Sequence, residues 1–225
     1  MYAALSEPDC RELFALFEEH YDGATWEIFR RDLSTKGWII VVRDEANRIQ
    51  GFTTLAIYES LTRDQPIGVI FSGDTIVRPA FWGRPELLRR WMKTVLAQTA
   101  QLPQPLYWFL ICSGYKTYRT LPVFAKEFYP CYAKPTPPEV QALMHQLATE
   151  RFGADYCPER GIIRFSTGAT PLKYGVADVT PERMQDPHIA FFVAHNPGYI
   201  QGDELVCLAQ FHFDNFSSAA RWMAR

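Results

Sequence analysis

A carboxylate inside an apolar strand is the first group in this sequence whose position suggests chemistry. Asp74 interrupts residues 68–77, most of which are apolar or β-branched and typical of a buried strand. Burial disfavours an ionised carboxylate and raises its pKa, which is one way that proteins tune an aspartate as a general base. A structural aspartate that accepts backbone hydrogen bonds near Gly73 fits the same pattern. Glu59, at the end of the preceding predicted strand, is the second candidate base.

The alternation of side chains along a strand assigns this segment two faces. One face is predicted to carry Ser72, Asp74 and Ile76, and the other Phe71, Gly73, Thr75 and Val77.

Three hydroxyl groups follow a second apolar strand and are the candidate proton donors. The strand spans residues 106–112, and Ser113, Tyr115 and Tyr118 come soon after it. Loops beyond the C-terminal ends of strands are where α/β folds place their sites. A tyrosine that packs its ring in the core and leaves its hydroxyl at the surface fits the sequence equally well.

A turn rich in Pro and Gly connects the first apolar strand to a helix predicted over residues 85–100. Pro85 suits the first turn of a helix, where its missing N–H has no helical partner. A strand, a turn and a helix N-terminus form an anion-binding geometry. Arg78 and Arg84 add charge that suits phosphate. An ordinary strand–helix connection with solvated arginines has the same sequence features.

The N-terminal half supplies the elements that must position these groups. Ser6 is a predicted helix N-cap, a second helix is predicted over residues 26–33, and strands over 38–42 and 49–58 form a hairpin. Gly51 inside the second strand indicates a bulge or a close backbone approach. A loop over residues 59–66 leads into the strand of Asp74. The two apolar strands are separated by one helix, so they are predicted to pair in parallel.

The C-terminal third is predicted to be less regular. A short helix over residues 122–128 precedes a helix that Thr136 and Glu139 open as a capping box. Strands are predicted over residues 161–166, 189–193 and 204–213. Asn215 is the predicted cap of a short terminal helix.

This order of elements resembles that of the GNAT superfamily of acyl-CoA-dependent N-acyltransferases. The resemblance covers roughly residues 1–130 and extends to the phosphate-binding loop of that family, Val-x-Pro-x-x-Arg/Gln-x-x-Gly-x-Gly/Ala. Val77 and Pro79 match this pattern, whereas Trp82 replaces its Arg or Gln, and Pro85 and Leu87 replace its small residues. The frame of the loop is kept and its most diagnostic residues differ.

The resemblance implies a fold of the α/β (α+β) class, with a mixed, mostly antiparallel sheet flanked by helices. It implies one domain over residues 1–225, with a core at 1–133 and a C-terminal elaboration at 134–225 that completes the sheet. It places coenzyme binding at Thr75, Ile76, Val77, Arg78, Trp82, Gly83 and Arg84.

The family also has a tyrosine that resembles a general acid for the leaving thiolate, and Phe124 stands at the matching position. A phenyl ring donates no proton, so the resemblance leaves Tyr115, Tyr118 or Ser113 for this role. The backbone N–H groups near Thr75 to Val77 are implied to polarise the thioester carbonyl.

The function implied is transfer of an acyl group from acyl-CoA, or from an acyl carrier protein, to a small-molecule or peptide amine by direct attack. Phe81 and Trp82 suit an acyl chain longer than acetyl or, equally, a packed core. The differences in the loop and at Phe124 favour an alternative, a non-catalytic GNAT-like module that binds a ligand or partner. A hydrolase with Cys112 or Ser113 as nucleophile is a third hypothesis, without a Gly-x-Ser-x-Gly motif in its support.

Composition narrows the class of protein. The 225 residues are 48% hydrophobic and 21% charged, which predicts a globular chain, and the net charge of −2 offers no electrostatic basis for binding nucleic acid. No apolar run approaches the ~20 residues of a membrane span. The first residues lack the basic and apolar regions of a secretory signal. The five cysteines form no Cys-x-x-Cys pair, which predicts a reducing, cytoplasmic location and no metal site.

Overall fold

A seven-stranded sheet with the order β1-β2-β3-β4-β7-β6-β5 runs through the computed structural model, which describes residues 5–225. Residues 1–4 lie outside the described part. The prediction that the first residues lack a secretory signal falls partly on them. The strands are β1 (Trp38–Arg43), β2 (Ile49–Thr62), β3 (Gln65–Val77), β4 (Leu106–Cys112), β5 (Tyr156–Cys157), β6 (Ile162–Ile163) and β7 (Glu204–Gln210). Within residues 5–225, β3 and β4 are the one parallel pair, as their separation by a single helix predicted.

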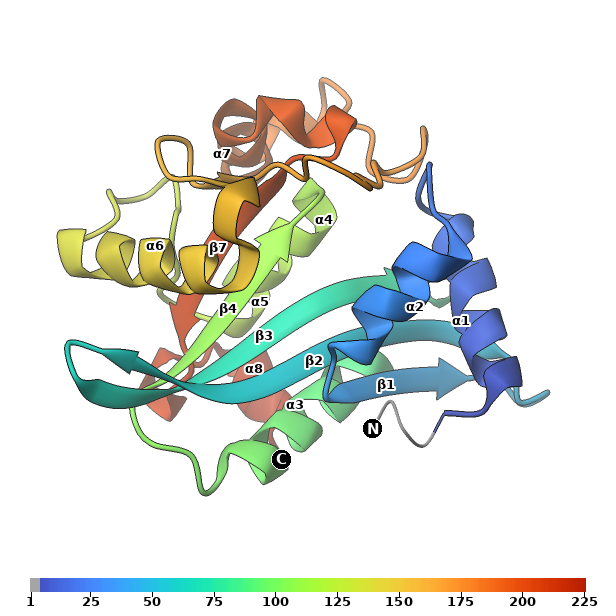
Figure 1. Ribbon diagram of the computed structural model, residues 1–225, viewed down its shortest axis with the longest axis horizontal. Coiled ribbons are helices and arrows are strands. Elements are labelled where there is room, and N and C mark those ends of the chain that lie inside the picture. Colours follow the sequence, from blue (N-terminus) through green and yellow to red (C-terminus); the bar gives the residue numbers. More distant parts are fainter. Residues whose placement is uncertain (1–4) are drawn as a thin grey trace.

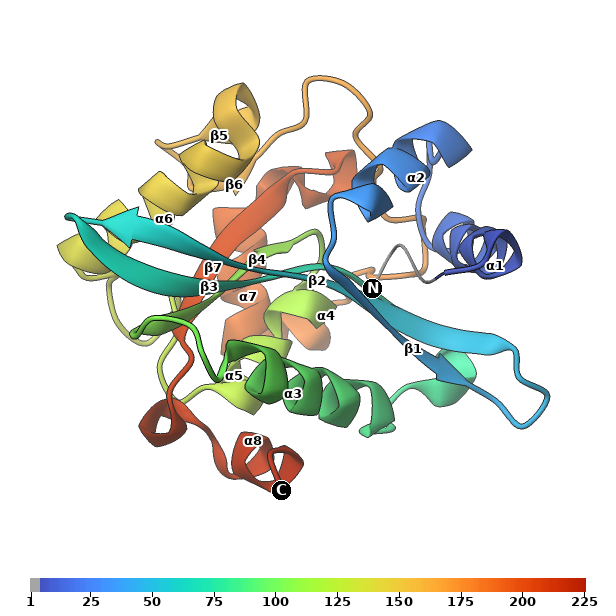
Figure 2. The ribbon, with the colours of Figure 1, turned by 60° about the horizontal axis from the view of Figure 1, so that its bottom comes forward.

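Helices cover both faces of this sheet (Figures 1 and 2). One face carries α1 (Glu7–Glu18), α2 (Trp26–Ser34) and α6 (Pro138–Phe152). The other carries α3 (Glu86–Thr99), α4 (Tyr115–Tyr118), α5 (Thr120–Phe124), α7 (Pro187–His195) and α8 (Ser218–Met223). The mixed, mostly antiparallel sheet flanked by helices that the GNAT resemblance implied is therefore confirmed.

Local sequence explains where several of these elements begin. Ser6 caps α1 by accepting a hydrogen bond from the backbone N–H of Asp9, as predicted. The apolar residues of α3 recur at helical spacing and bury Leu87, Trp91 and Val95 against the sheet. The close approach predicted at Gly51 is present, because a Cβ there would lie 3.0 Å from the carbonyl oxygen of Ile76.

A bulge in β3 overturns the predicted alternation of its side chains. Thr53 pairs with Thr75 and Leu55 pairs with Ser72, so two residues of β3, Gly73 and Asp74, lie opposite Thr54 alone. An extra residue in one strand reverses the faces that follow it. Asp74 and Ile76 therefore lie on the face of α1, α2 and α6, while Ser72, Thr75 and Val77 lie on the face of α3.

The two parallel strands separate where this bulge begins. Residues 68–72 of β3 pair with residues 106–110 of β4, and the pairing stops at Ser72 and Leu110. Beyond this point the strands diverge (Figure 1), β3 toward α1 and β4 toward α4. The sheet is thus open between the C-terminal ends of β3 and β4.

Several local predictions differ from the structure. The helix expected over residues 122–128 ends at Phe124, and the strand expected over 161–166 is the two-residue β6. Residues 59–66 do not form a loop, because β2 and β3 continue to a tight hairpin at Arg63 and Asp64, both at positive φ. Residues 189–193 lie in helix α7 rather than a strand, since Asp186 caps a helix that starts at Pro187. The cap of α6 is Pro137, without a side-chain bond, and Ser217 rather than Asn215 caps α8.

Candidate functional site

Two cavities lie on opposite faces of the sheet and meet at the opening between β3 and β4. The apolar cavity, on the face of α3, has a volume of about 530 Å³. The charged cavity, on the face of α2 and α6, has a volume of about 640 Å³. Gly73, Thr75 and Thr117 line both cavities. The two cavities therefore adjoin at these three residues.

Aromatic side chains form the inner wall of the apolar cavity. Trp91 of α3, Trp108 of β4 and Phe124 of α5 pack together with ring centroids 5.1 to 5.4 Å apart. The indole N–H of Trp108 donates to the hydroxyl of Ser72 over 2.9 Å, which satisfies that donor within the wall. The wall suits hydrocarbon rather than charge.

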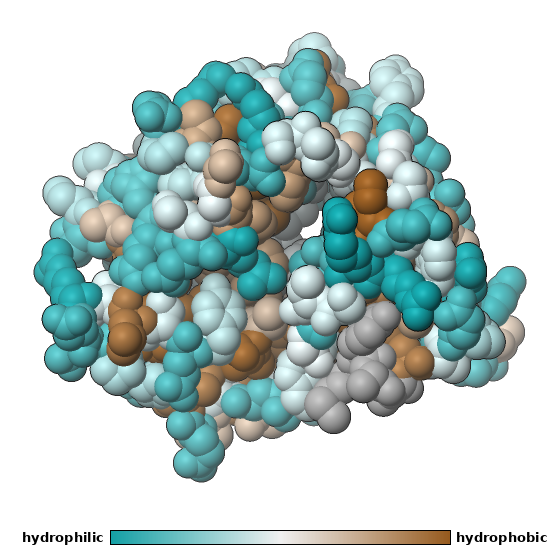
Figure 3. Space-filling model, viewed as in Figure 1, coloured by the Kyte–Doolittle hydropathy of each residue, from teal (hydrophilic) through white to brown (hydrophobic). Residues whose placement is uncertain are grey.

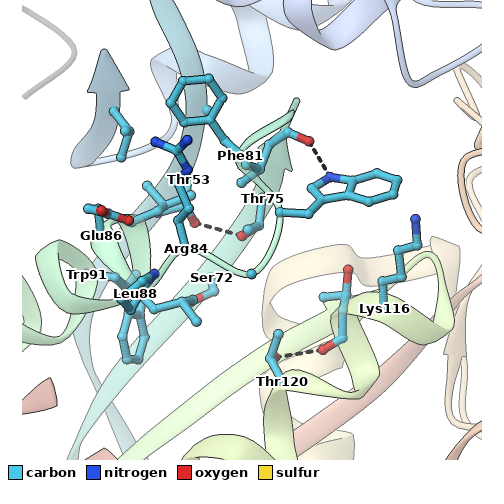
Figure 4. Close-up of a pocket in the computed structure, with 18 of the residues that line it drawn as sticks. Thr53, Ser72, Thr75, Phe81, Arg84, Glu86, Leu88, Trp91, Lys116 and Thr120 are labelled. Atoms are coloured by element: carbon cyan, nitrogen blue, oxygen red, sulfur yellow. Dashed lines mark hydrogen bonds between the residues drawn. The ribbon is translucent and has the colours of Figure 1, made fainter. Parts of the chain in front are cut away.

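The connection between β3 and α3 forms the mouth of the apolar cavity (Figure 4). The Trp82 indole folds back on the loop and donates to the carbonyl oxygen of Val77 over 2.7 Å. Two cations stand against aromatic rings here: the Lys116 ammonium lies 3.6 Å from the Trp82 ring centroid, and the Arg84 guanidinium lies 4.4 Å from that of Phe81. The mouth therefore carries two cations against the single carboxylate of Glu86, while the interior is apolar.

The N-terminus of α3 also faces this cavity. Pro85 is its N-cap residue and makes no side-chain capping bond, and Glu86, Leu87 and Leu88 of the first turn all line the cavity. First-turn N–H groups have no partner within their own helix, and the helix dipole favours an anion there. Pro85 itself contributes no N–H, so this terminus has one donor fewer than another residue would give.

The predicted coenzyme-binding residues do not all line the same cavity. Five of them line the apolar cavity: Thr75, Val77, Trp82, Gly83 and Arg84. The Ile76 side chain instead packs in the core beneath α1 and α2, on the other face of the sheet. The Arg78 guanidinium pairs with the Glu19 carboxylate, with oxygens 2.5 and 2.7 Å away, and lines neither cavity. A phosphate-binding role for the Arg78 side chain is therefore not supported.

Four polar groups from adjacent strand ends and from the segment after α1 meet in the charged cavity. Asp74 lies near the end of β3, Ser113 follows β4, and Glu204 begins β7, the strand on the other side of β4. The Tyr21 hydroxyl lies 3.3 Å from that of Ser113. An antiparallel neighbour starts where β4 ends, so the sheet itself brings these groups to one edge.

Burial perturbs the acids of this cavity. The pKa of Asp74 is raised to about 6, mainly by desolvation and also by the Asp32 carboxylate, while Lys36 opposes the rise. The pKa of Glu204 is raised to about 8 by desolvation and then by the charge of Asp74. The pKa of Tyr21 is also raised, first by burial. Burial thus favours the protonated form of both carboxyls, and each charge raises the cost of ionising the other.

The other predicted acid and base residues do not reach the opening. Glu59 is exposed on β2 opposite Gly68 and lines neither cavity. Tyr118 is fully buried and donates to the carbonyl oxygen of Pro130 over 2.9 Å. Tyr115 is buried in the core formed with α3 and α7. Ser113 is the predicted donor that does line a cavity, on the charged side.

Sequence reasoning did not single out Glu204 or Tyr21. Glu204 is an acid at the edge of an apolar strand, the same signal that selected Asp74, but its strand was not known to adjoin β4. Tyr21 gives no such signal, because it lies just after α1 and reaches the cavity through a bridge to Leu172. Cys112, the nucleophile of the hydrolase hypothesis, is fully buried, and burial raises the pKa of its thiol well above the usual range, which disfavours the reactive thiolate.

Comparison with known proteins gives partial likenesses of fold. No protein-family model and no curated protein matches the chain. Among solved structures it is similar to a probable N-acyltransferase of unknown function from Enterococcus faecalis, with 16% identity, a TM-score of 0.43, and coverage of 55% of this chain and 31% of that one. This chain thus spans less than a third of the Enterococcus protein.

Two further structures are an acetyltransferase and a coenzyme complex. The Trypanosoma brucei acetyltransferase has 21% identity and a TM-score of 0.30 over 42% of this chain and 72% of that one. A Mycobacterium tuberculosis protein in complex with CoA and NLQ has 13% identity and a TM-score of 0.39 over 91% and 95%. These TM-scores are all below 0.5, so they do not assign the fold. The fold follows from the strand order and helix placement of this chain.

Two features are absent from residues 5–225. In that part of the chain, no helix combines the length and the apolar character needed to cross a bilayer. No three His, Cys, Asp or Glu side chains of these residues are grouped as a metal site.

Proposed function

We propose that the protein transfers an acyl group from a coenzyme A thioester to an amine by direct attack. The observation that carries this proposal is the meeting of two different cavities at Gly73, Thr75 and Thr117, in the opening between β3 and β4. Direct transfer needs both substrates bound at once, with their reacting atoms close together. Two cavities that share one opening through the sheet meet that requirement.

The donor occupies the apolar cavity in this proposal. Its inner wall of Trp91, Trp108 and Phe124 suits the pantetheine arm and the acyl chain. The positive mouth, with Arg84, Lys116 and the N-terminus of α3, suits the phosphates. An acyl carrier protein, which presents the same thioester arm, is the second donor that this geometry accepts.

The acceptor amine occupies the charged cavity, where Asp74 acts as the base. The amine nitrogen attacks the thioester carbonyl carbon, a C–N bond forms, and the C–S bond breaks. The amine reaches the site as an ammonium, and the Asp74 carboxylate takes one proton from it so that the nitrogen has a lone pair for the attack. The second proton, lost once the C–N bond has formed, passes to the departing thiolate. The thiol, whose pKa is close to the ~8.5 of cysteine, leaves as thiolate and needs only weak assistance. We assign this assistance to the hydroxyl of Thr117, a residue that lines both cavities.

A non-catalytic binding module is the second candidate function. Pro85 removes one N–H from the α3 N-terminus, and Phe124 replaces the tyrosine of the family pattern with a ring that donates no proton. Both features favour a protein that holds a thioester or a related ligand without turning it over.

A thermal-shift series separates these possibilities. A ligand that binds only the native state raises the apparent melting temperature by mass action. We expect coenzyme A and acyl-CoAs of increasing chain length to raise it, and the best chain length to identify the donor. Release of free thiol in the presence of a primary amine then tests catalysis. Binding without thiol release, across a broad amine panel, would support the binding module. An absence of any shift would argue against the apolar cavity as a coenzyme site.

A further inference from the structure

The charged cavity contains a guanidinium that has no carboxylate partner. Arg151, near the end of α6, lines the cavity and is partly buried. Its guanidinium carbon lies 3.7 Å from the ring centroid of Phe71 and 6.0 Å from that of Tyr58. Within residues 5–225 Arg151 forms no ion pair. A desolvated cation of this kind binds an anion more strongly than a solvated one does.

The acids near Arg151 are engaged elsewhere. Asp32 is close enough to favour the charged form of Arg151, but its carboxylate pairs with Lys36 over 2.9 Å. The neighbouring Glu150 carboxylate accepts hydrogen bonds from Ser60 over 3.0 Å and from Gln146 over 2.7 Å. Among the described cations that line the cavity, Arg31 is exposed and Lys36 pairs with Asp32. This leaves the partly buried Arg151 available to a ligand.

A carboxylate, that of Asp74, lies further along the face of β3 on which Arg151 packs. Asp74 is three residues beyond Phe71, on which Arg151 stacks, and the bulge places both side chains in the charged cavity. Three residues of strand span at most about 10 Å. The cavity therefore presents a cation and a carboxylate within the reach of one small molecule.

We infer that the acceptor is a zwitterionic amino carboxylate, an amino acid in the broad sense. Its amine meets Asp74 at the opening, and its carboxylate meets Arg151 as a planar, bidentate pair. This inference deepens the proposed function and rests on it for the identity of the reaction. It adds that the carboxylate of the acceptor, which takes no part in the chemistry, determines which amines are used.

The test compares acceptors that differ only in the carboxylate. Each set contains an amino acid, its carboxamide and its decarboxylated amine, and the sets range from α- to ω-amino acids. We expect kcat/KM for the amino acid of the best set to exceed that of both analogues at least tenfold. Equal use of the three members in every set would overturn the inference while leaving acyl transfer intact.

Variants of Arg151 separate recognition from structural support. Arg151→Met keeps the apolar packing on Phe71 and removes the charge, so kcat/KM for the amino acid should fall about 10- to 100-fold while that for the decarboxylated amine is unchanged. Arg151→Lys keeps the charge without the bidentate geometry of a guanidinium, so its kcat/KM for the amino acid should lie between those of the wild type and Arg151→Met. Arg160→Met, at an exposed arginine outside both cavities, is the matched control. An equal loss for both acceptors would assign Arg151 a structural role only.

A binding measurement keeps the inference independent of catalysis. Calorimetric titration of the wild-type protein with the same sets needs no turnover. If no acceptor is acylated yet amino acids bind more tightly than their amides in an Arg151-dependent way, the inference stands and the proposed reaction fails. If none of the amino acids binds better than its amide, the inference is wrong.

Discussion

The side chains of Ser72 and Asp74, two residues apart on β3, lie in different cavities on opposite faces of the sheet. In a regular strand they would share one face. The bulge at Gly73 and Asp74 reverses the alternation and lies beside the point where β3 and β4 stop pairing. A carboxylate is thereby directed into the charged cavity, while Ser72 remains against Trp108 in the wall of the apolar one.

Removal of the Asp74 carboxylate tests its role as base. A raised pKa of about 6 means that the proton-accepting form is lost below that pH. We expect kcat/KM of the wild-type protein to fall about tenfold per pH unit on the acid side of about 6, and Asp74→Asn to lower kcat about 100- to 10,000-fold at pH 7.5. Rates measured from pH 5 to 9 check both. The melting-temperature shift with coenzyme A is the control and should persist, because Asp74 does not line the apolar cavity.

Glu204 makes stability depend on pH. Its folded-state pKa of about 8 is above the ordinary value of 4.5, so the native state binds its proton more tightly than the unfolded state does. This contribution to stability is complete below about pH 4.5 and is lost as the pH rises through about 8. Glu204→Gln remains neutral, so we expect it to be more stable than wild type at pH 9 by at least about 1 kcal/mol, since one pKa unit corresponds to about 1.4 kcal/mol. Urea unfolding at pH 4.5 and pH 9 measures the difference. A gain that is the same at both values would contradict the assignment.

Tyr118 is expected to matter for stability and not for the rate. Its hydroxyl donates to the carbonyl oxygen of Pro130 away from both cavities. Tyr118→Phe should lower the free energy of unfolding by about 1 kcal/mol, the usual cost of one buried hydrogen bond, and leave kcat within twofold. Denaturant titration and the thiol-release assay check the two effects. A large fall in kcat with unchanged stability would return Tyr118 to the role of general acid.

Replacement of Pro85 tests whether the α3 N-terminus binds phosphate. Its backbone has φ −82° and ψ −4°, which alanine adopts without strain. Pro85→Ala adds one N–H at the N-terminus, so the Kd for coenzyme A should fall about tenfold, the effect of one hydrogen bond to a charged group. Calorimetry with pantetheine, which lacks the phosphates, is the matched control and should give an unchanged Kd. Tighter binding of both ligands, or of neither, would place the phosphates elsewhere.

The sequence by itself determined the elements whose signals are local. The apolar run at residues 106–112 forms β4 with the predicted bounds, and Ser6 caps α1 as its residue type predicted. The parallel pairing of β3 and β4 also followed, because a strand, one helix and another strand have few ways to connect. Asp74 was selected because a carboxylate in an apolar strand is unusual wherever that strand lies.

Tertiary structure alone decided which groups meet. The bulge depends on the pairing of β3 with β2, so residues 68–77 do not encode by themselves the face on which Asp74 lies. Glu204 is 130 positions away from Asp74 in the chain and reaches the same cavity only because β7 pairs with β4. The pKa values of both acids follow from burial by elements distant in sequence. Alternation and propensity report on neighbours along the chain, whereas register, burial and charge depend on neighbours in space.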